Sequence, residues 1–586
     1  MQTLRLFDLL PRYAQKFNKP DMLACKIDGK WVTYSSEQVS EMANLISYGL
    51  FQMGINRNDK ISIISNNRPE WIITNMGMME AGAINVPIYP TISENDLLYI
   101  LNDVEVKYVF VSNLDMYNKV NKIKHKVPSL LTIYSFDKVD GVNHWIEIID
   151  LGKKFNYIEK LEVVKESILS SDMATILYTS GTTGNPKGVM LSHNNLISNA
   201  LATQDCAPFN YNWRILSFLP LNHVFERMLT ILYIYKGASI YYAESMEKIS
   251  DNLKEINPHC FATVPRLLEK VYDKIVAKGH EQKGIKKILF FWALDLGLRY
   301  ELDGKNGMWY EFQLKLANKI IFNKWREALG GNIIGIISGG AALQPRLARV
   351  FTAAKIRILE GYGLTETSPV IAVNNFKPNS ICFGTVGPII DGVEVKFAAD
   401  GEILVKGPNV MLGYYKREAE TKEAMKDGWF HTGDIGQLVD NRFLKITDRK
   451  KEIFKTSGGK FIAPQVIENK LKESPFIEQV MVIGEGQRFP AALVVPSFAY
   501  LKDYCKIKGI DYLSNVDIVK NEQIIEKLNK EIEKLNQTFS NFEMIKKIKL
   551  MPKEWTIESG EMTPKLSLKR NLILKANEAI VNEIYK

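Results

Sequence analysis

The chain has 586 residues, of which 46% are hydrophobic and 24% are charged, and its formal net charge is +9. This length predicts two or more domains, and the composition is that of an ordinary globular protein. No uncharged apolar run reaches the roughly 18 residues that a membrane span needs, and the five cysteines form no CxxC pair, which argues against a disulfide framework or a zinc site.

The first residues, MQTLRLFDLLPRYAQKF, place apolar side chains at helical spacing. The helical spacing of Leu4, Phe7, Leu9, Leu10 and Tyr13 indicates a helix that covers a domain surface. The segment lacks a signal-peptide layout because Asp8 interrupts its apolar stretch. The cysteine usage and this layout together predict a cytoplasmic protein.

From residue 60 onwards, strand-like runs alternate with helix-like segments. The alternation predicts an α/β fold with largely parallel sheets flanked by helices. The expected strands are Lys60–Ser65, Ala83–Tyr89, Lys107–Ser112, Arg214–Leu219, Ala238–Ala243 and Asn332–Ser338, and expected helices include Val224–Tyr235 and Gln344–Lys355.

The stretch Tyr178–Gly188 reads YTSGTTGNPKG and follows an apolar strand, Met173–Tyr178. A helix is expected to begin near Ser192, so the loop would lie between a strand and a helix and gather donors around a phosphate. Its candidate phosphate-binding residues are Thr179, Ser180, Gly181, Thr182, Thr183, Gly184 and Lys187. The alternative is a simple polar turn. The loop is not a Walker A motif, because Pro186 precedes the lysine and Gly188 follows it.

The pattern changes in the C-terminal third of the chain. Short strands separated by turn residues fill 387–448 and predict a small β-barrel-like unit within a large domain that spans 1–448. Residues 449–586 combine two strands, around Val480 and Leu493, with a charged helix at Asn521–Thr538. This part is expected to be a separate, smaller α+β domain.

Four more motifs follow the glycine-rich loop in order: SGGA at 338–341, GYGLTET at 361–367, WFHTGD at 429–434 and DRKK at 448–451. The five motifs together resemble those of the adenylate-forming enzymes, a superfamily of acyl-CoA synthetases, peptide-synthetase adenylation domains and luciferases. The resemblance covers essentially the whole chain. It implies a large N-terminal domain and a mobile C-terminal domain.

Three further segments are similar to long-chain acyl-CoA synthetases: VPIYPTIS at 86–93, PLNHVFERM at 220–228 and PRLLEKVYDKI at 265–275. They favour a long-chain fatty acid as the substrate over an amino acid or luciferin. The helix-rich, aromatic region at 265–332 is extra relative to short-chain relatives. Such an insertion usually serves local packing.

The resemblance implies two half-reactions, in which a carboxylate and ATP give acyl-AMP and CoA then displaces AMP. Glu366 is expected to hold Mg²⁺, and Thr365 to give its hydroxyl to a phosphate. Tyr362 would pack against adenine, with Gly339 and Gly340 on the adenine side. The alternative for Glu366 alone is a solvated surface acid.

The resemblance assigns further roles in the second half of the motif set. Asp434 and Arg449 are expected to contact the ribose, although an aspartate in this context can also form a turn. Lys451 matches the pivot between the domains, and Gly458 and Gly459 match the loop that lines the pantetheine tunnel.

His223 resembles the aromatic position beside the substrate carboxylate, and its alternative is a structural donor at a helix start.

One motif departs from the family pattern. The family carries a catalytic lysine near the C-terminus, three residues before an arginine, but here Met562–Arg570 reads MTPKLSLKR and Ser567 occupies that position. Lys565 and Lys569 flank it. Lys565 is favoured because it follows a Thr-Pro turn and is in phase with Ser567 on an extended segment. The alternative is that both lysines are merely solvated.

The sequence therefore predicts a long-chain fatty acid–CoA ligase that uses ATP, CoA and Mg²⁺ and associates peripherally with the inner face of the membrane. Rivals are a fatty acyl-AMP ligase that loads a carrier protein, and a lipid-binding or uptake protein with a vestigial nucleotide site. No basic block interleaved with aromatics indicates nucleic-acid binding. Chain-length preference and oligomeric state are not predicted.

Overall fold

The computed structural model describes residues 4–155, 157–179, 185–556, 559–562 and 568–586. The predicted site residues Ser180, Gly181, Thr182, Thr183, Gly184 and Lys565 lie outside these ranges. The chain divides into two compact units, one of Met1–Val395 with Val405–His431 and one of Lys396–Leu404 with Thr432–Lys586. The expected domain boundary between residues 448 and 449 stays a prediction.

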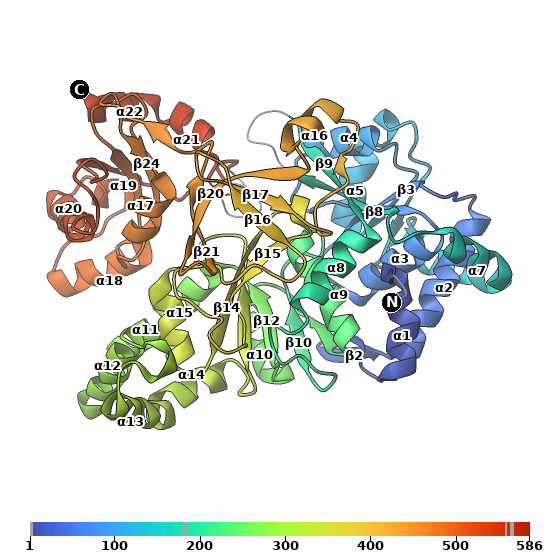
Figure 1. Ribbon diagram of the computed structural model, residues 1–586, viewed down its shortest axis with the longest axis horizontal. Coiled ribbons are helices and arrows are strands. Elements are labelled where there is room, and N and C mark those ends of the chain that lie inside the picture. Colours follow the sequence, from blue (N-terminus) through green and yellow to red (C-terminus); the bar gives the residue numbers. More distant parts are fainter. Residues whose placement is uncertain (1–3, 156, 180–184, 557–558, 563–567) are drawn as a thin grey trace. The chain divides into compact units, whose positions relative to one another are not determined.

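The first unit contains two eight-stranded sheets (Figure 1). One sheet has the order β15 (Val370–Val373), β14 (Arg357–Gly363), β13 (Gly335–Ser338), β12 (Cys260–Thr263), β10 (Arg214–Ser217), β11 (Ser239–Tyr242), β1 (Leu23–Ile27) and β2 (Lys30–Tyr34). Its inner pairs are parallel, whereas β14 and β15 at one edge and β1 and β2 at the other are antiparallel.

The other sheet has the order β18 (Gly413–Tyr414), β9 (Lys187–Ser192), β8 (Met173–Thr179), β4 (Ile84–Pro87), β3 (Lys60–Ile64), β5 (Tyr108–Val111), β6 (Thr132–Ser135) and β7 (Asn143–His144). It is parallel from β8 to β7 and antiparallel where β9 joins β8 and β18. All six expected strands are present, so the prediction of an α/β fold with parallel-rich sheets is confirmed.

Helices flank both sheets. In the first unit they are η1 (Leu6–Asp8), α1 (Leu9–Lys16), α2 (Ser36–Gln52), α3 (Pro69–Glu80), α4 (Glu94–Asp103), α5 (Leu114–Ile123), η2 (Lys124–Lys126), α6 (Ile146–Lys154), α7 (Ile158–Ser167), α8 (His193–Thr203), α9 (Val224–Lys236), α10 (Ile249–Ile256), α11 (Pro265–Glu281), α12 (Gly284–Leu298), η3 (Leu302–Gly304), α13 (Met308–Ala317), η4 (Asn318–Phe322), α14 (Asn323–Ala328), α15 (Pro345–Ala353), η5 (Thr365–Thr367) and α16 (Glu418–Ala424). The insertion at 265–332 is therefore helical, as its pattern predicts.

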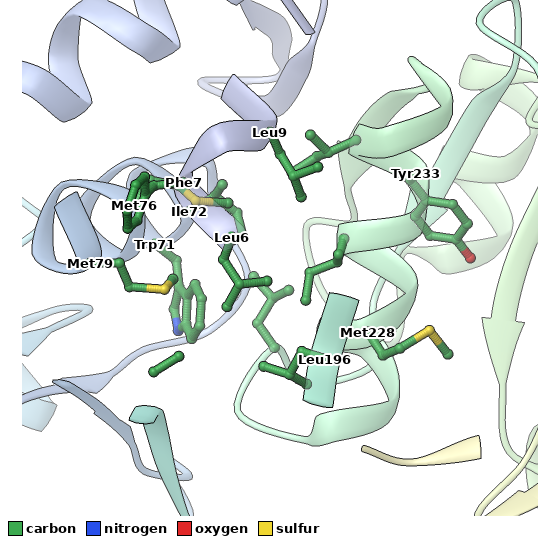
Figure 2. Packing of buried hydrophobic residues seen from close by; sticks show 14 of the residues in the cluster. Leu6, Phe7, Leu9, Trp71, Ile72, Met76, Met79, Leu196, Met228 and Tyr233 are labelled. Carbon is green, nitrogen blue, oxygen red and sulfur yellow. The ribbon is translucent and has the colours of Figure 1, made fainter. Parts of the chain in front are cut away.

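The main core fixes the helices that carry site residues. The N-terminal apolar face is buried, and Leu6 lies between Trp71 of α3 and the side chains of Leu196 on α8 and Met228 on α9 (Figure 2). Helix α8 follows the strand that leaves the glycine-rich loop, and α9 begins directly after His223. Close packing at this core holds both helices in one arrangement.

The β-rich segment forms a five-stranded sheet of β16 (Glu394–Phe397), β17 (Glu402–Lys406), β19 (Met425–Lys426), β20 (Trp429–Val439) and β21 (Phe443–Arg449). The C-terminal part has the strand pair β22 (Phe454–Lys455) and β23 (Phe461–Ile462) and a sheet of β24 (Ile477–Ile483), β25 (Ala491–Pro496) and β26 (Lys547–Leu550). Its helices are α17 (Pro464–Leu471), α18 (Phe498–Lys508), α19 (Asn515–Ile518), α20 (Glu522–Asn536), α21 (Arg570–Ala576) and α22 (Glu578–Tyr585). This is the expected α+β arrangement.

Glu226 on α9 is a carboxylic acid in the interior, with 1% of its surface exposed. Its Oε1 accepts a hydrogen bond of 2.6 Å from the Ser217 hydroxyl. Burial raises the pKa of Glu226 from its ordinary value of 4.5 to about 8, and the Ser217 hydrogen bond lowers it by a smaller amount. The folded protein therefore holds a proton on this group at neutral pH.

We predict that Glu226→Gln changes thermal stability in a pH-dependent manner. Because the pKa of Glu226 is raised in the folded protein, its contribution to the free energy of unfolding is fully present below about pH 4.5. This contribution falls by about 1.4 kcal/mol per pH unit as the pH rises towards 8. Glutamine does not ionise, so the melting temperature of the variant should rise relative to that of the wild type between pH 5 and pH 8. The exposed Glu159→Gln serves as the control, and an equal offset at both pH values would contradict the prediction.

Candidate active site

The glycine-rich loop connects two antiparallel strands. Thr179, the last residue of β8, pairs with Lys187, the first residue of β9. Helix α8 begins only at His193, with Ser192 as its N-cap. The prediction of a strand-to-helix loop is thus wrong, although the helix start near Ser192 is confirmed. Four of the six residues of β9 are buried. The strand pairs with β8, and antiparallel strands can be joined by a short loop.

Packing explains the last glycine of this motif. A Cβ on Gly188 would lie 2.8 Å from Ile176 Cγ2 and 3.0 Å from Tyr178 Cζ. Glycine is therefore required here for close approach of β9 to β8. At the loop's base the Thr179 hydroxyl donates to the carbonyl oxygen of Lys187 at 3.5 Å.

Glu366 lies on η5, a single turn that follows β14. Thr365 and Thr367 are buried on either side of it, and Glu366 itself is half-buried. The Thr367 hydroxyl accepts from the backbone N–H of Leu364 at 3.0 Å. Asn409 donates to the Thr367 carbonyl at 3.0 Å, which fixes the far end of the turn.

Tyr414 contacts both charged residues predicted for the phosphate site. Its hydroxyl donates to Glu366 Oε1 at 3.0 Å, and Lys187 Nζ lies 5.3 Å from its ring centroid. β18, which contains Tyr414, pairs with β9 so that Tyr414 is opposite Val189. Burial, together with the Glu366 charge, raises the pKa of Tyr414. The structure thus brings Lys187 and Glu366 together through one neutral phenol.

A second group of predicted residues gathers around Gly339. A Cβ at this buried position would lie 3.2 Å from Phe225 Cζ and 3.6 Å from the Gly361 carbonyl oxygen. The segment SGGA therefore contacts both the start of α9 and the start of GYGLTET. Gly340, which follows, has φ +83, a left-handed conformation that favours glycine.

His223 and Tyr362 belong to the same region. The Phe225 N–H donates to His223 Nδ1 at 3.1 Å, so the imidazole caps α9. This bond places the proton of the neutral ring on Nε2. Tyr362 is half-buried on β14, where it pairs with Ala372 of β15.

In the second unit, the two predicted ribose residues are partners in the β20–β21 register. Arg449 Nε lies 3.5 Å from Asp434 Oδ1, and the Asp434 side chain is 8% exposed against 51% for Arg449. The register of β20 and β21 shifts between Ile435 and Gly436, so an irregularity in the pairing begins just after Asp434. The pair can present one carboxylate and one guanidinium to a common ligand.

Lys451 lies in a turn directly after β21. The N–H groups of Glu452 and Ile453 both donate to the Arg449 carbonyl, at 2.9 and 3.1 Å. Lys451 lies within this turn, and its side chain is exposed.

Gly458 and Gly459 lie in the tight turn that joins β22 to β23. The Gly459 N–H donates to the Thr456 carbonyl at 2.9 Å. Gly459 has φ +77, and a Cβ on Gly458 would meet nothing closer than 4.0 Å.

Arg570 fixes the C-terminal flank of the MTPKLSLKR segment. Its guanidinium donates to Glu468 Oε1 and to the Val482 carbonyl oxygen, each at 2.7 Å. Met562 and Leu568 form an antiparallel bridge. Lys569 is exposed, whereas Lys565 lies outside the described residues, so the choice between the two lysines stays a prediction.

Magnesium was expected to bind Glu366. Within the described ranges, no three His, Cys, Asp or Glu side chains gather as a metal cage. Mg²⁺ is typically held by one or two carboxylates and by substrate phosphates. Glu366 is a single half-buried carboxylate, and Tyr414 contacts both it and Lys187, which fits that donor set.

Sequence reasoning missed the residues that hold this site together. Tyr414 and Asn409 are more than 40 positions from the turn that they contact, and Asn199 of α8 bonds both the N–H and the carbonyl of Val370. No local motif marks long-range hydrogen bonds of this kind. The only local feature that could have drawn attention to Tyr414 is the tyrosine pair in GYYK at 413–416.

Two family models match the chain. The model described as AMP-binding enzyme covers residues 13–415, and that described as AMP-binding enzyme C-terminal domain covers residues 451–586. The chain belongs to the AMP-binding enzyme family. This confirms the resemblance to adenylate-forming enzymes that the five motifs carry.

Curated proteins that are similar to this chain include long-chain-fatty-acid–CoA ligases. The long-chain-fatty-acid–CoA ligase FadD15 of Mycobacterium bovis is 31% identical, over 95% of this chain and 93% of its own length. Human long-chain-fatty-acid–CoA ligase 1 is also 31% identical, over 95% and 82%. These likenesses confirm the predicted enzyme class, an AMP-forming ligase of the long-chain acyl-CoA synthetase type.

Solved structures of the family share the fold. The adenylation domain of the carboxylate reductase from Mycobacterium chelonae matches with a TM-score of 0.77 at 18% identity, over 100% of this chain and 92% of that one. A Mycobacterium tuberculosis fatty acyl CoA synthetase matches with a TM-score of 0.65 at 19% identity, over 98% and 99%.

We predict that alanine is harmful at one glycine of GYGLTET and tolerated at another. A Cβ on Gly363 would lie 1.7 Å from the Pro369 carbonyl oxygen, whereas one on Gly361 would meet nothing closer than 3.5 Å. Gly363→Ala should therefore displace the η5 turn, cost about 1–3 kcal/mol of stability and slow acyl-adenylate formation. Gly361→Ala is the matched control. Equal melting temperatures and rates for the two variants would rule out this packing argument.

Proposed function

We propose that this enzyme activates a long-chain fatty acid in two half-reactions at one site. The fatty acid carboxylate attacks the α-phosphorus of ATP and expels pyrophosphate, which leaves acyl-AMP. The CoA thiol then attacks the acyl carbon, loses its proton and expels AMP. The observation that carries this proposal is the arrangement of Lys187, Tyr414 and Glu366 beside the phosphate loop.

Charge neutralisation is the main task of the first half-reaction, because one anion must approach another. We assign Lys187 and the loop residues to the ATP phosphates, and Thr365 to a phosphate oxygen. Glu366 would hold Mg²⁺, which neutralises phosphate charge when it is bound. Tyr414 fixes the direction of the Glu366 carboxylate, because its hydroxyl occupies one lone pair of Oε1.

The remaining assignments follow the family motifs. Tyr362 would stack on adenine, with the Gly339–Gly340 backbone at its edge and His223 beside the fatty acid carboxylate. Asp434 and Arg449 would contact the ribose.

For the second half-reaction we propose Lys451 as the pivot residue and the Gly458–Gly459 turn as part of the pantetheine path. Lys565 would serve as the catalytic lysine, with Lys569 as the alternative.

We further propose that the enzyme acts in the cytoplasm, at the inner face of the membrane. No helix in the described part of the chain has the length and hydropathy of a membrane span. A long-chain fatty acid partitions into a bilayer, so its activation is favoured where the enzyme touches that surface.

We predict that the wild type exchanges label between pyrophosphate and ATP only when palmitate is present. Glu366→Gln should lower this exchange by about 10²-fold, because it removes a charge that acts in the transition state. Glu418→Gln, an exposed change on α16, should leave the rate unchanged.

The same assay separates the rival functions. Formation of palmitoyl-CoA after addition of CoA is expected, whereas exchange without thioester formation would favour a ligase that loads a carrier protein. Absence of exchange in the wild type would contradict the proposed reaction and favour a lipid-binding protein.

A further inference from the structure

The helical insertion of the first unit exposes large apolar side chains. Helices α12 and α13 lie together with α11 beyond α14 and α15 (Figure 1). Six side chains on α12 and α13, the α12–α13 ridge, are exposed: Ile285 (74%), Ile288 (69%), Met308 (92%), Trp309 (71%), Phe312 (60%) and Leu316 (42%). Other residues of the same helices, including Leu294 and Leu314, lie in the core. Both helices are therefore apolar on an outer side as well as on the side that packs inward.

The two helices present the ridge on one surface. They run antiparallel, because Tyr310 donates to the Leu296 carbonyl and Trp292 Nε1 donates to Gln313 Oε1 at 3.2 Å. This register places Leu316 opposite the exposed isoleucines of α12. Trp309 and Phe312 are stacked, with ring centroids 5.7 Å apart. Exposed apolar side chains grouped on two neighbouring helices are typical of an interaction site.

Positive charge surrounds the ridge. Residues 283–324 contain seven lysines and one arginine but four acidic residues. The Asp295–Arg299 pair cancels one charge of each sign, and Glu301 is neutralised by Arg349, which lies outside this stretch. Exposed lysines lie directly beside ridge residues at 286, 287, 315 and 319. Aromatic and aliphatic side chains flanked by lysines are typical of surfaces that bind anionic membranes.

We propose that the α12–α13 ridge inserts into the headgroup region of an anionic lipid bilayer. This inference deepens the proposed peripheral association and rests on the proposed fatty acid substrate, which partitions into such a bilayer. Trp309 and Phe312 would enter the acyl boundary while the lysines contact lipid phosphates. A second copy of the chain is a poorer occupant, because a symmetric contact through this ridge would bring the same lysines face to face.

The test is cosedimentation of the full chain with phosphatidylcholine vesicles that either contain or lack phosphatidylglycerol. Trp309→Ser/Phe312→Ser should lower the partition coefficient by about tenfold or more. Lys315→Gln/Lys319→Gln should lower it by about thirtyfold on anionic vesicles only. Ile507→Ser/Leu513→Ser is the matched control, since these exposed apolar residues (80% and 84%) lie outside the ridge; it should bind as the wild type does.

Pyrophosphate exchange with octanoate, a water-soluble acid, is measured on every variant without vesicles and should stay unchanged. Unchanged vesicle binding by Trp309→Ser/Phe312→Ser, or absence of wild-type binding, would overturn the proposal. A wild-type dimer that this variant converts to a monomer, with no change in vesicle binding, would assign the ridge to a second copy and also overturn it. Ridge-dependent binding by a protein that lacks all exchange would support the ridge and refute the proposed reaction.

Discussion

The repulsion between a carboxylate and the triphosphate of ATP is the constraint on which the first unit is built. Opposite charges must be held in place before the substrates meet, since groups that reorganise during the reaction stabilise its transition state poorly. In the proposed site, the hydrogen bond from Tyr414 to Glu366 would meet this need. Tyr414 orients the carboxylate from β18, which is paired with β9, the strand that begins at Lys187. The same pair of strands therefore positions both Glu366 and Lys187.

The frame itself depends on how the sheets end. Parallel strands build the interior of both large sheets, but the motifs lie at antiparallel edges, β8 with β9 and β14 with β15. Parallel strands need long crossovers, whereas antiparallel neighbours can be joined by a short loop. The described residues that flank the glycine-rich segment, and the η5 turn, are thereby held by strands at the places where phosphate chemistry is proposed.

Much of the fold and site followed from local patterns. The buried strands appear as apolar runs, so the alternating architecture could be predicted. The unusual spacing of the glycine motifs led to Glu366 and Asp434 as proposed site residues. The prediction of a strand-to-helix loop was wrong because Lys187–Ser192 combines apolar residues with a lysine, and its pairing with β8 is set by tertiary contacts. The contacts of Tyr414 and Asn199 could not be predicted from local patterns, because their partners lie far along the chain.

A double-mutant cycle between Tyr414→Phe and Glu366→Gln, read as the single-turnover rate of acyl-adenylate formation, tests the central claim most directly. If Tyr414 acts by orienting the carboxylate, its removal should slow the wild type several-fold but have little further effect once Glu366 is replaced. Strictly additive losses in free energy of activation would show that the two residues act independently and would contradict this account.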